Sequence, residues 1–234
     1  MKKFGFVLLG IFVVVALLGG FFVADNVVRD QAETRVQEQL VTKFSAPEGQ
    51  TQADVKLNGF PFLAYLVTHK FKSGTISASN VYLAEDDLTI AHANFDFTDL
   101  YNPKSGPGKV GSAQGTLVLS YDELTKQSGT DEFTMRYAGN ERVEAKTSVD
   151  MFGTPAEITM SFGLKIEGNV LSYVDPKISV SGLDIPQSLL DSALSEEDLS
   201  TELPNEDGLK YESVTPAEEG IIINVSAADW EIPE

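Results

Sequence analysis

Residues 157–166 read EITMSFGLKI, and along this stretch apolar side chains alternate with polar or small ones. A period of two places all the apolar side chains on one face of a β-strand. The preceding segment, 142–149, repeats the pattern, and residues 170–180 also read as a strand. Turn sequences containing Gly, Asn or Pro separate the three segments. The middle of the chain is therefore predicted to be a run of antiparallel hairpins with one apolar face.

Further strands are predicted on both sides of these hairpins. Their ranges are 75–83, 88–97, 110–120, 133–137, 209–214 and 220–227, with an alternating segment around Val55 and Leu57. A short helix is predicted after Ser120, because residues 120–123 have capping-box spacing. The predicted fold class is α+β: one long, twisted antiparallel sheet curled around amphipathic helices, preceded by an N-terminal transmembrane helix.

Residues 25–44 are predicted to form the first amphipathic helix. Val28, Ala32, Val36, Leu40 and Phe44 recur every four residues, and charged and amide side chains fill the opposite side. This pattern predicts a helix that packs against the sheet. The alternative is a helix that lies on a membrane surface, which the mixed charges of the polar side disfavour.

A second amphipathic helix is predicted over residues 186–199. Leu189, Leu190, Ala193 and Leu194 share one side of it, and acidic residues follow. Beyond the final hairpin, Trp230 is predicted to lie in a short polar tail.

The first 24 residues have the properties of a membrane segment. Residues 4–24 carry no charge, and as a helix they would span about 31 Å, close to the thickness of a bilayer's hydrocarbon core. Lys2 and Lys3 place the N-terminus in the cytoplasm and the rest of the chain outside. A cleaved signal peptide is the alternative, disfavoured by the long apolar run and by Phe22 near the best cleavage position. We therefore predict an anchor at 1–24 and an extracytoplasmic domain at 25–234.

Composition excludes several classes of function. The formal net charge is −18, so the surface repels phosphate backbones, and we predict no binding of nucleic acid. Cysteine is absent, which excludes disulfides, thiol catalysis and thiolate metal sites. His69 and His92 have no partner at metal-ligand spacing, and the sequence contains neither a nucleophile elbow nor a phosphate loop. We predict that the protein is not an enzyme and uses no cofactor or metal.

An aromatic stretch around one proline stands out from the acidic remainder. Residues 58–66 read NGFPFLAYL, and Phe71 follows. Pro61 suits the first turn of a helix, which we expect to end at His69 and Lys70, with residues 73–74 terminating the element. Two interpretations stay open, a short core helix and the wall of an apolar lipid cavity, because both have the same hydrophobic periodicity.

Three parts of the chain resemble the LmeA-like phospholipid-binding proteins of the actinobacterial envelope. They are the N-terminal segment followed at once by a helix with Ala32 and Leu40, residues 55–63 (VKLNGFPFL) with Phe71 downstream, and the closing hairpin from Gly208. The resemblance implies a protein that binds phospholipid outside the cytoplasm and assists envelope construction, such as lipoglycan elongation. It implies no catalytic residues.

A protein that binds phospholipid must bury the acyl chain in apolar surroundings comparable to those of the bilayer. Removing a chain of about 16 carbons costs on the order of 13 kcal/mol at ~0.8 kcal/mol per methylene, so we expect an apolar groove or tunnel. The predicted lipid-binding residues are Phe60, Phe62, Leu63, Leu66 and Phe71, with Val36 and Leu40 from the first helix. The alternative is a non-catalytic envelope interaction or scaffold domain with a solid core.

Overall fold

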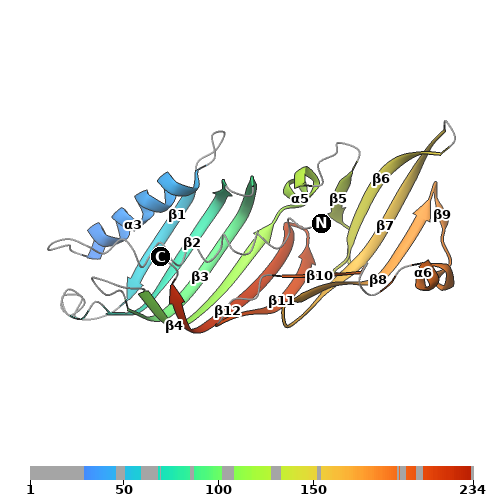
Figure 1. The fold of residues 1–234 in the computed structure, drawn as a ribbon. Coiled ribbons are helices and arrows are strands. Elements are labelled where there is room, and N and C mark those ends of the chain that lie inside the picture. Colours follow the sequence, from blue (N-terminus) through green and yellow to red (C-terminus); the bar gives the residue numbers. More distant parts are fainter. Residues whose placement is uncertain are drawn as a thin grey trace. The chain divides into compact units, whose positions relative to one another are not determined.

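The computed structural model describes residues 29–45, 51–58, 68, 70–84, 87–101, 108–127, 133–151, 154–193, 195, 199–203 and 208–232. These residues form mostly β-structure, with two six-stranded antiparallel sheets and three helices (Figure 1). The predicted anchor at 1–24 lies outside them. Within the described ranges, no helix is long and apolar enough to cross a membrane.

The prediction of one long sheet was wrong, because the strands divide between two. The chain also forms two compact units: unit 1 comprises residues 1–117, 204–212 and 224–234, and unit 2 comprises residues 118–203 and 213–223. The first sheet has the order β1-β2-β3-β4-β12-β11, and the second has the order β10-β8-β7-β6-β5, with β9 on β8. The two sheets arise because β4 pairs with β12 from the far end of the chain, while β5 to β10 pair with one another.

In the first sheet, the strands are β1 (Gln52–Asn58), β2 (Lys70–Leu83), β3 (Leu88–Tyr101), β4 (Gly108–Leu119), β11 (Leu209–Ala217) and β12 (Gly220–Ile232). Helix α3 (Arg29–Phe44) packs on β1 and β2 and buries Val36, Leu40 and Phe44 (Figure 1). The Glu33 carboxylate accepts a hydrogen bond from the Leu57 N–H at 2.8 Å, which ties the helix to β1. The predicted packing of this helix against a sheet is confirmed.

Strand β2 begins at Lys70, five residues before the predicted start, so Lys70 does not lie in a helix and residues 73–74 do not end an element. Gly74 lies opposite Phe97 of β3 in the register. A Cβ at Gly74 would overlap the Phe97 ring, so this glycine makes room for an aromatic side chain rather than ending a segment.

Trp230 does not lie in a polar tail, because β12 continues to Ile232 and buries it in unit 1. Asp229 has a left-handed φ of 49° and breaks the alternation of the strand, so the side chain after it turns inward. Gly208, with a φ of 89°, lies against Trp230 and accepts a hydrogen bond from the Ala228 N–H at 3.1 Å.

The second sheet contains β5 (Thr134–Tyr137), β6 (Val143–Met151), β7 (Thr154–Glu167), β8 (Val170–Val180), β9 (Leu183–Asp184) and β10 (Ser200–Glu202). The predicted hairpins from β5 to β8 are confirmed, and each neighbouring pair is antiparallel. Helix α5 (Tyr121–Gln127) begins as predicted, with the Glu123 N–H donating to the Ser120 hydroxyl at 3.2 Å.

Helix α6 (Gln187–Ala193) is much shorter than the predicted helix at 186–199. Its predicted apolar side is only partly buried: Leu190 is covered, whereas Leu189 and Ala193 are exposed. Consecutive residues of a helix point in different directions, so Leu190 faces inward while Leu189 points to solvent.

Candidate functional site

The interior of unit 1 contains three of the predicted lipid-binding residues. Val36 and Leu40 lie on the buried side of α3, and Phe71 lies on β2 opposite Leu100. Each of the three is at most 3% exposed. Phe60, Phe62, Leu63 and Leu66 lie outside the described residues. The predicted lining as a set therefore stays a prediction.

Aromatic rings and glycines interlock on the inner side of the first sheet. Phe97 lies over Gly74 of β2, and Phe95 lies over Gly115 of β4, where a Cβ would overlap either ring. Phe95 and Phe97 are themselves buried. Rings that fill the space above neighbouring glycines leave this part of unit 1 closely packed.

The second sheet presents a different surface, which we call the β6–β8 face. Cross-strand register places its residues in rows: Val143 with Phe162, then Ala145, Met160 and Ile178, then Thr147, Ile158 and Val180, then Val149 with Ala156. The polar residues of the same strands alternate with these and occupy the opposite side. The β6–β8 face is thus an apolar surface of unit 2, interrupted at Thr147.

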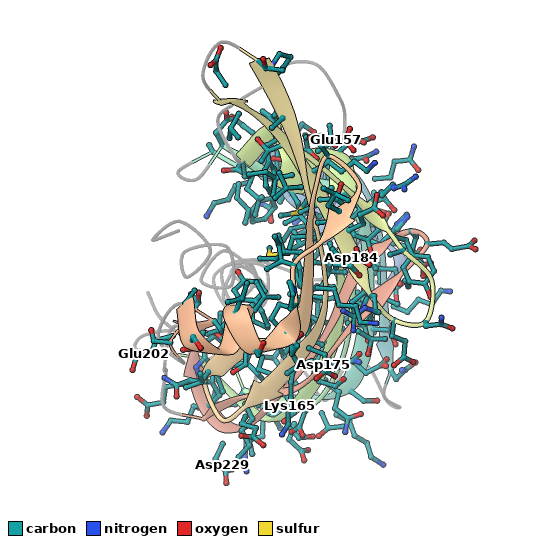
Figure 2. All side chains as sticks on the ribbon, turned by 90° about the vertical axis from the view of Figure 1, so that its right-hand side faces the viewer. Glu157, Lys165, Asp175, Asp184, Glu202 and Asp229 are labelled. Carbon is teal, nitrogen blue, oxygen red and sulfur yellow. The ribbon has the colours of Figure 1, made fainter. Side chains whose placement is uncertain are left out.

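Burial varies along the β6–β8 face, where Ala145 and Ala156 are buried, at 4% and 7% exposed. Val143 and Phe162 in the first row are fully buried, at 0% and 3% exposed. Met160 and Ile178 in the second row, and Ile158 and Val180 in the third, are only half-buried. In Figure 2, helix α6 lies on one side of this sheet, while the labelled Glu157 and Asp184 project on the other. The four half-buried residues therefore stay partly accessible, although the alternation of apolar residues predicts that this face is buried in a core.

A β-bulge between β7 and β8 is held by one arginine. The register shifts between Ser161 and Gly163, and Asp175 adopts a left-handed φ of 48°. The Arg142 guanidinium donates to the Ser161 hydroxyl at 3.0 Å, to the Ser161 carbonyl at 2.8 Å and to the Asp175 carbonyl at 2.6 Å. Arg142 thus links β7 and β8, and its guanidinium is hydrogen-bonded to backbone carbonyls of both strands.

Two lysines on the polar side of the second sheet form ion pairs. Lys146 lies 3.4 Å from Glu157, and Lys165 lies 2.6 Å from Glu167. The hydrogen bond and positive charge of Lys165 lower the pKa of the Glu167 carboxyl. These cations are engaged on the side of the sheet opposite to the apolar rows.

An aromatic pair borders the buried row of the β6–β8 face. The rings of Phe162 and Tyr173 meet edge to face, with centroids 5.1 Å apart. Desolvation raises the pKa of Tyr173, whose hydroxyl is hydrogen-bonded to the side chain of Thr201. The phenol is therefore neutral at physiological pH.

The fold and its surfaces define a mostly β protein whose second sheet exposes one apolar side. Residues 19–226 match the LmeA-like phospholipid-binding family, and the chain belongs to that family. The resemblance noted in the sequence is thereby confirmed. No curated protein and no solved structure matches the chain significantly.

Proposed function

We propose that this protein binds phospholipid through its acyl chains and that the β6–β8 face of unit 2 is the surface on which a chain lies. The observation that carries the proposal is the pair of half-buried apolar rows around Met160 and Ile158. Apolar surface left partly accessible in this way is typical of a ligand or membrane site in a protein that is otherwise strongly charged. Membership of a phospholipid-binding family supplies the ligand class.

The dimensions of the face suit an acyl chain. From Ala156 to Phe162 along β7 there are six residue steps, and at 3.3–3.4 Å each they span about 20 Å. An acyl chain crosses half of a hydrocarbon core that is about 30 Å thick, or roughly 15 Å. The face as a whole is as long as the chain, and its half-buried residues Ile158 and Met160 would contact the middle of it.

The binding we propose is non-catalytic, and the head group stays outside the apolar rows. Lys146, Lys165 and Lys177 lie on the polar side and Arg142 lies at the bulge, away from the apolar rows, so selection falls on the acyl chain more than on the phosphate. We further propose that residues 1–24 anchor the chain, that residues 25–234 lie outside the cytoplasm, and that lipid binding there assists assembly of the cell envelope. The uncharged run at 4–24 and the lysines before it support this placement.

Photolabelling tests the proposed site directly. A phosphatidylcholine with a diazirine on its acyl chain is incubated with the full chain, and labelled peptides are identified by mass spectrometry. We expect label on β7 and β8, and we expect Met160→Glu to remove most of it because a carboxylate then enters the apolar row. Thr159→Glu is the matched control, since it adds the same charge to the adjacent residue on the polar side. Equal labelling of both variants would exclude the β6–β8 face.

A solid scaffold domain is the second candidate, and the burial of unit 1 favours it. Ile76, Val110 and Phe97 are at most 2% exposed, as in a closely packed core. The variant Leu66→Trp, at one of the predicted lipid-binding residues, distinguishes a lipid cavity from a solid core. A lipid cavity loses lipid but stays folded when it is filled, whereas a solid core loses stability through overpacking.

A further inference from the structure

Both large hydrophobic side chains that are exposed in the described part of the chain lie in one segment, Ile178–Leu190. Leu183 is 75% exposed and Leu189 is 58% exposed. The segment reads ISVSGLDIPQSLL and carries one charge, at Asp184, although 22% of the whole chain is charged. A surface segment with a single charge and two exposed leucines is unexpected in so acidic a protein, and it indicates a contact with an apolar phase.

Backbone hydrogen bonds hold Leu183 in its exposed position. Strand β8 turns into β9 through Ser181 and Gly182, whose φ values of 50° and 81° fit a two-residue hairpin turn. The Ser181 N–H donates to the Glu157 carbonyl of β7 at 2.7 Å, and the Ile185 N–H donates to the Ile178 carbonyl at 2.8 Å. The leucine is therefore presented by a hairpin that is fastened to the sheet.

Leu183 extends the β6–β8 face. It pairs with Val180, which pairs with Ile158, so the third row of the face ends on the exposed leucine. Asp184 pairs with Ser179 and, like Glu157, points to the polar side (Figure 2). The hairpin thus has an apolar side that continues the proposed lipid surface and an acidic side that faces away from it.

We propose that the segment Ile178–Leu190 docks into the interfacial region of a phospholipid bilayer, so that an acyl chain passes from the membrane along Leu183 onto the β6–β8 face. This inference rests on the proposed function. A protein that takes a phospholipid must touch the bilayer in which the lipid resides. The segment's single charge, Asp184, points to the polar side, so the segment enters the interface without burying an ion, while the net charge of −18 disfavours anionic membranes. The partner surface is therefore a bilayer of zwitterionic phospholipid.

Tryptophan quenching tests the docking. Leu183→Trp and Asp184→Trp are prepared in the full chain, where Trp230 is the one native tryptophan and is only 3% exposed. Each variant is reconstituted into phosphatidylcholine vesicles whose acyl chains carry bromine, which quenches an indole that reaches them. We expect strong additional quenching in Leu183→Trp and none in Asp184→Trp, whose side chain points to the polar side. Adding phosphatidylglycerol to the vesicles should reduce the quenching.

A transfer assay separates docking from lipid binding. Leu189→Asp should slow photolabelling from vesicles about tenfold or more, because the lost burial of one leucine is worth roughly that factor. Labelling by a dispersed short-chain phosphatidylcholine should be unchanged, since Leu189 is not part of the β6–β8 face and that probe needs no membrane contact. If the dispersed probe labels the unsubstituted chain but Leu183→Trp is not quenched, docking is wrong and the proposed function stands.

Two other outcomes also overturn the inference. Equal quenching of the two tryptophan variants would show that the hairpin has no membrane-facing side. A blue shift of Leu183→Trp that grows with protein concentration in the absence of vesicles would show that a second copy of the chain covers the leucine. If the dispersed probe fails to label the unsubstituted chain, the proposed function itself fails.

Discussion

Unit 1 and unit 2 both place apolar side chains on one side of an antiparallel sheet, but they bury them to different extents. In unit 1 the inner residues of β2 and β3, such as Ile76 and Phe97, are almost inaccessible, and α3 packs on β1 and β2. In unit 2 the same alternation leaves Ile158 and Met160 half-buried. Apolar alternation therefore determines which side of a sheet is apolar, whereas the burial of that side depends on the elements that pack on it.

The largest predicted difference concerns matched isoleucines. Ile76→Ala in unit 1 should lower the free energy of unfolding by about 2–5 kcal/mol, because it leaves a cavity in a closed core. Ile158→Ala in unit 2 should cost only ~1 kcal/mol or less, because its side chain is already partly in solvent. Hydrogen exchange of peptides from β2 and β7 measures each loss locally. Equal losses would mean that the two apolar sides are equally packed.

Glycine substitutions are expected to give the next largest difference in stability between the two units. Gly115→Ala should destabilise unit 1 by about 1–3 kcal/mol, because the new methyl group meets the buried ring of Phe95. In unit 2, Gly163→Ala should cost less, since its Cβ would lie 2.9 Å from a terminal methyl of Val174. Thermal unfolding followed by circular dichroism compares the two. A larger loss for Gly163→Ala would contradict the tighter packing assigned to unit 1.

The helix cap in unit 2 carries a smaller effect. Ser120→Ala removes the hydroxyl that accepts from the Glu123 N–H and should cost about 1 kcal/mol. Ser120→Asp keeps an acceptor at the cap and is the matched control, which should retain most of the stability. Denaturant titration gives both values, and an equal loss in the two variants would show that the cap does not stabilise α5.

The smallest effect is expected at the exposed pair of Lys165 and Glu167. The lysine lowers the pKa of Glu167 in the folded state, so any stabilisation is present above the unfolded pKa and is lost as the pH falls through the folded pKa. Because both side chains are well exposed, Glu167→Gln should leave stability at pH 7 unchanged within error. A clear destabilisation that disappears at high salt would show that the pair matters.

Local patterns predicted the hairpins of unit 2 well. Alternation fixed the faces of β6 and β7, and glycine-containing turns fixed their ends, because both signals lie within a few residues of each other. The cap at Ser120 was predictable for the same reason. Pairing between distant strands was not, since no local signal in β4 indicates that β12 lies beside it.

Glycine and apolar residues misled the prediction where their partners lie far away in sequence. Gly74 looked like a terminator because its reason for being small, the Phe97 ring, lies on another strand. Trp230 looked like part of a tail because the left-handed Asp229 that turns it inward leaves no periodic pattern. Leu183 received no prediction, because it lies between the predicted strand at 170–180 and the predicted helix at 186–199, and only the fold shows that it is exposed.

The central claim is that the half-buried β6–β8 face receives a phospholipid acyl chain, and the photolabelling map tests it most directly. The full chain is labelled with the acyl-chain diazirine phosphatidylcholine, and label is quantified on peptides from β7 and β8 and on peptides from β2 and β3. The predicted result is label concentrated at Ile158, Met160 and Ile178, with little on the closed strands of unit 1. Label that is absent from β7 and β8, or spread evenly over both sheets, would contradict the claim.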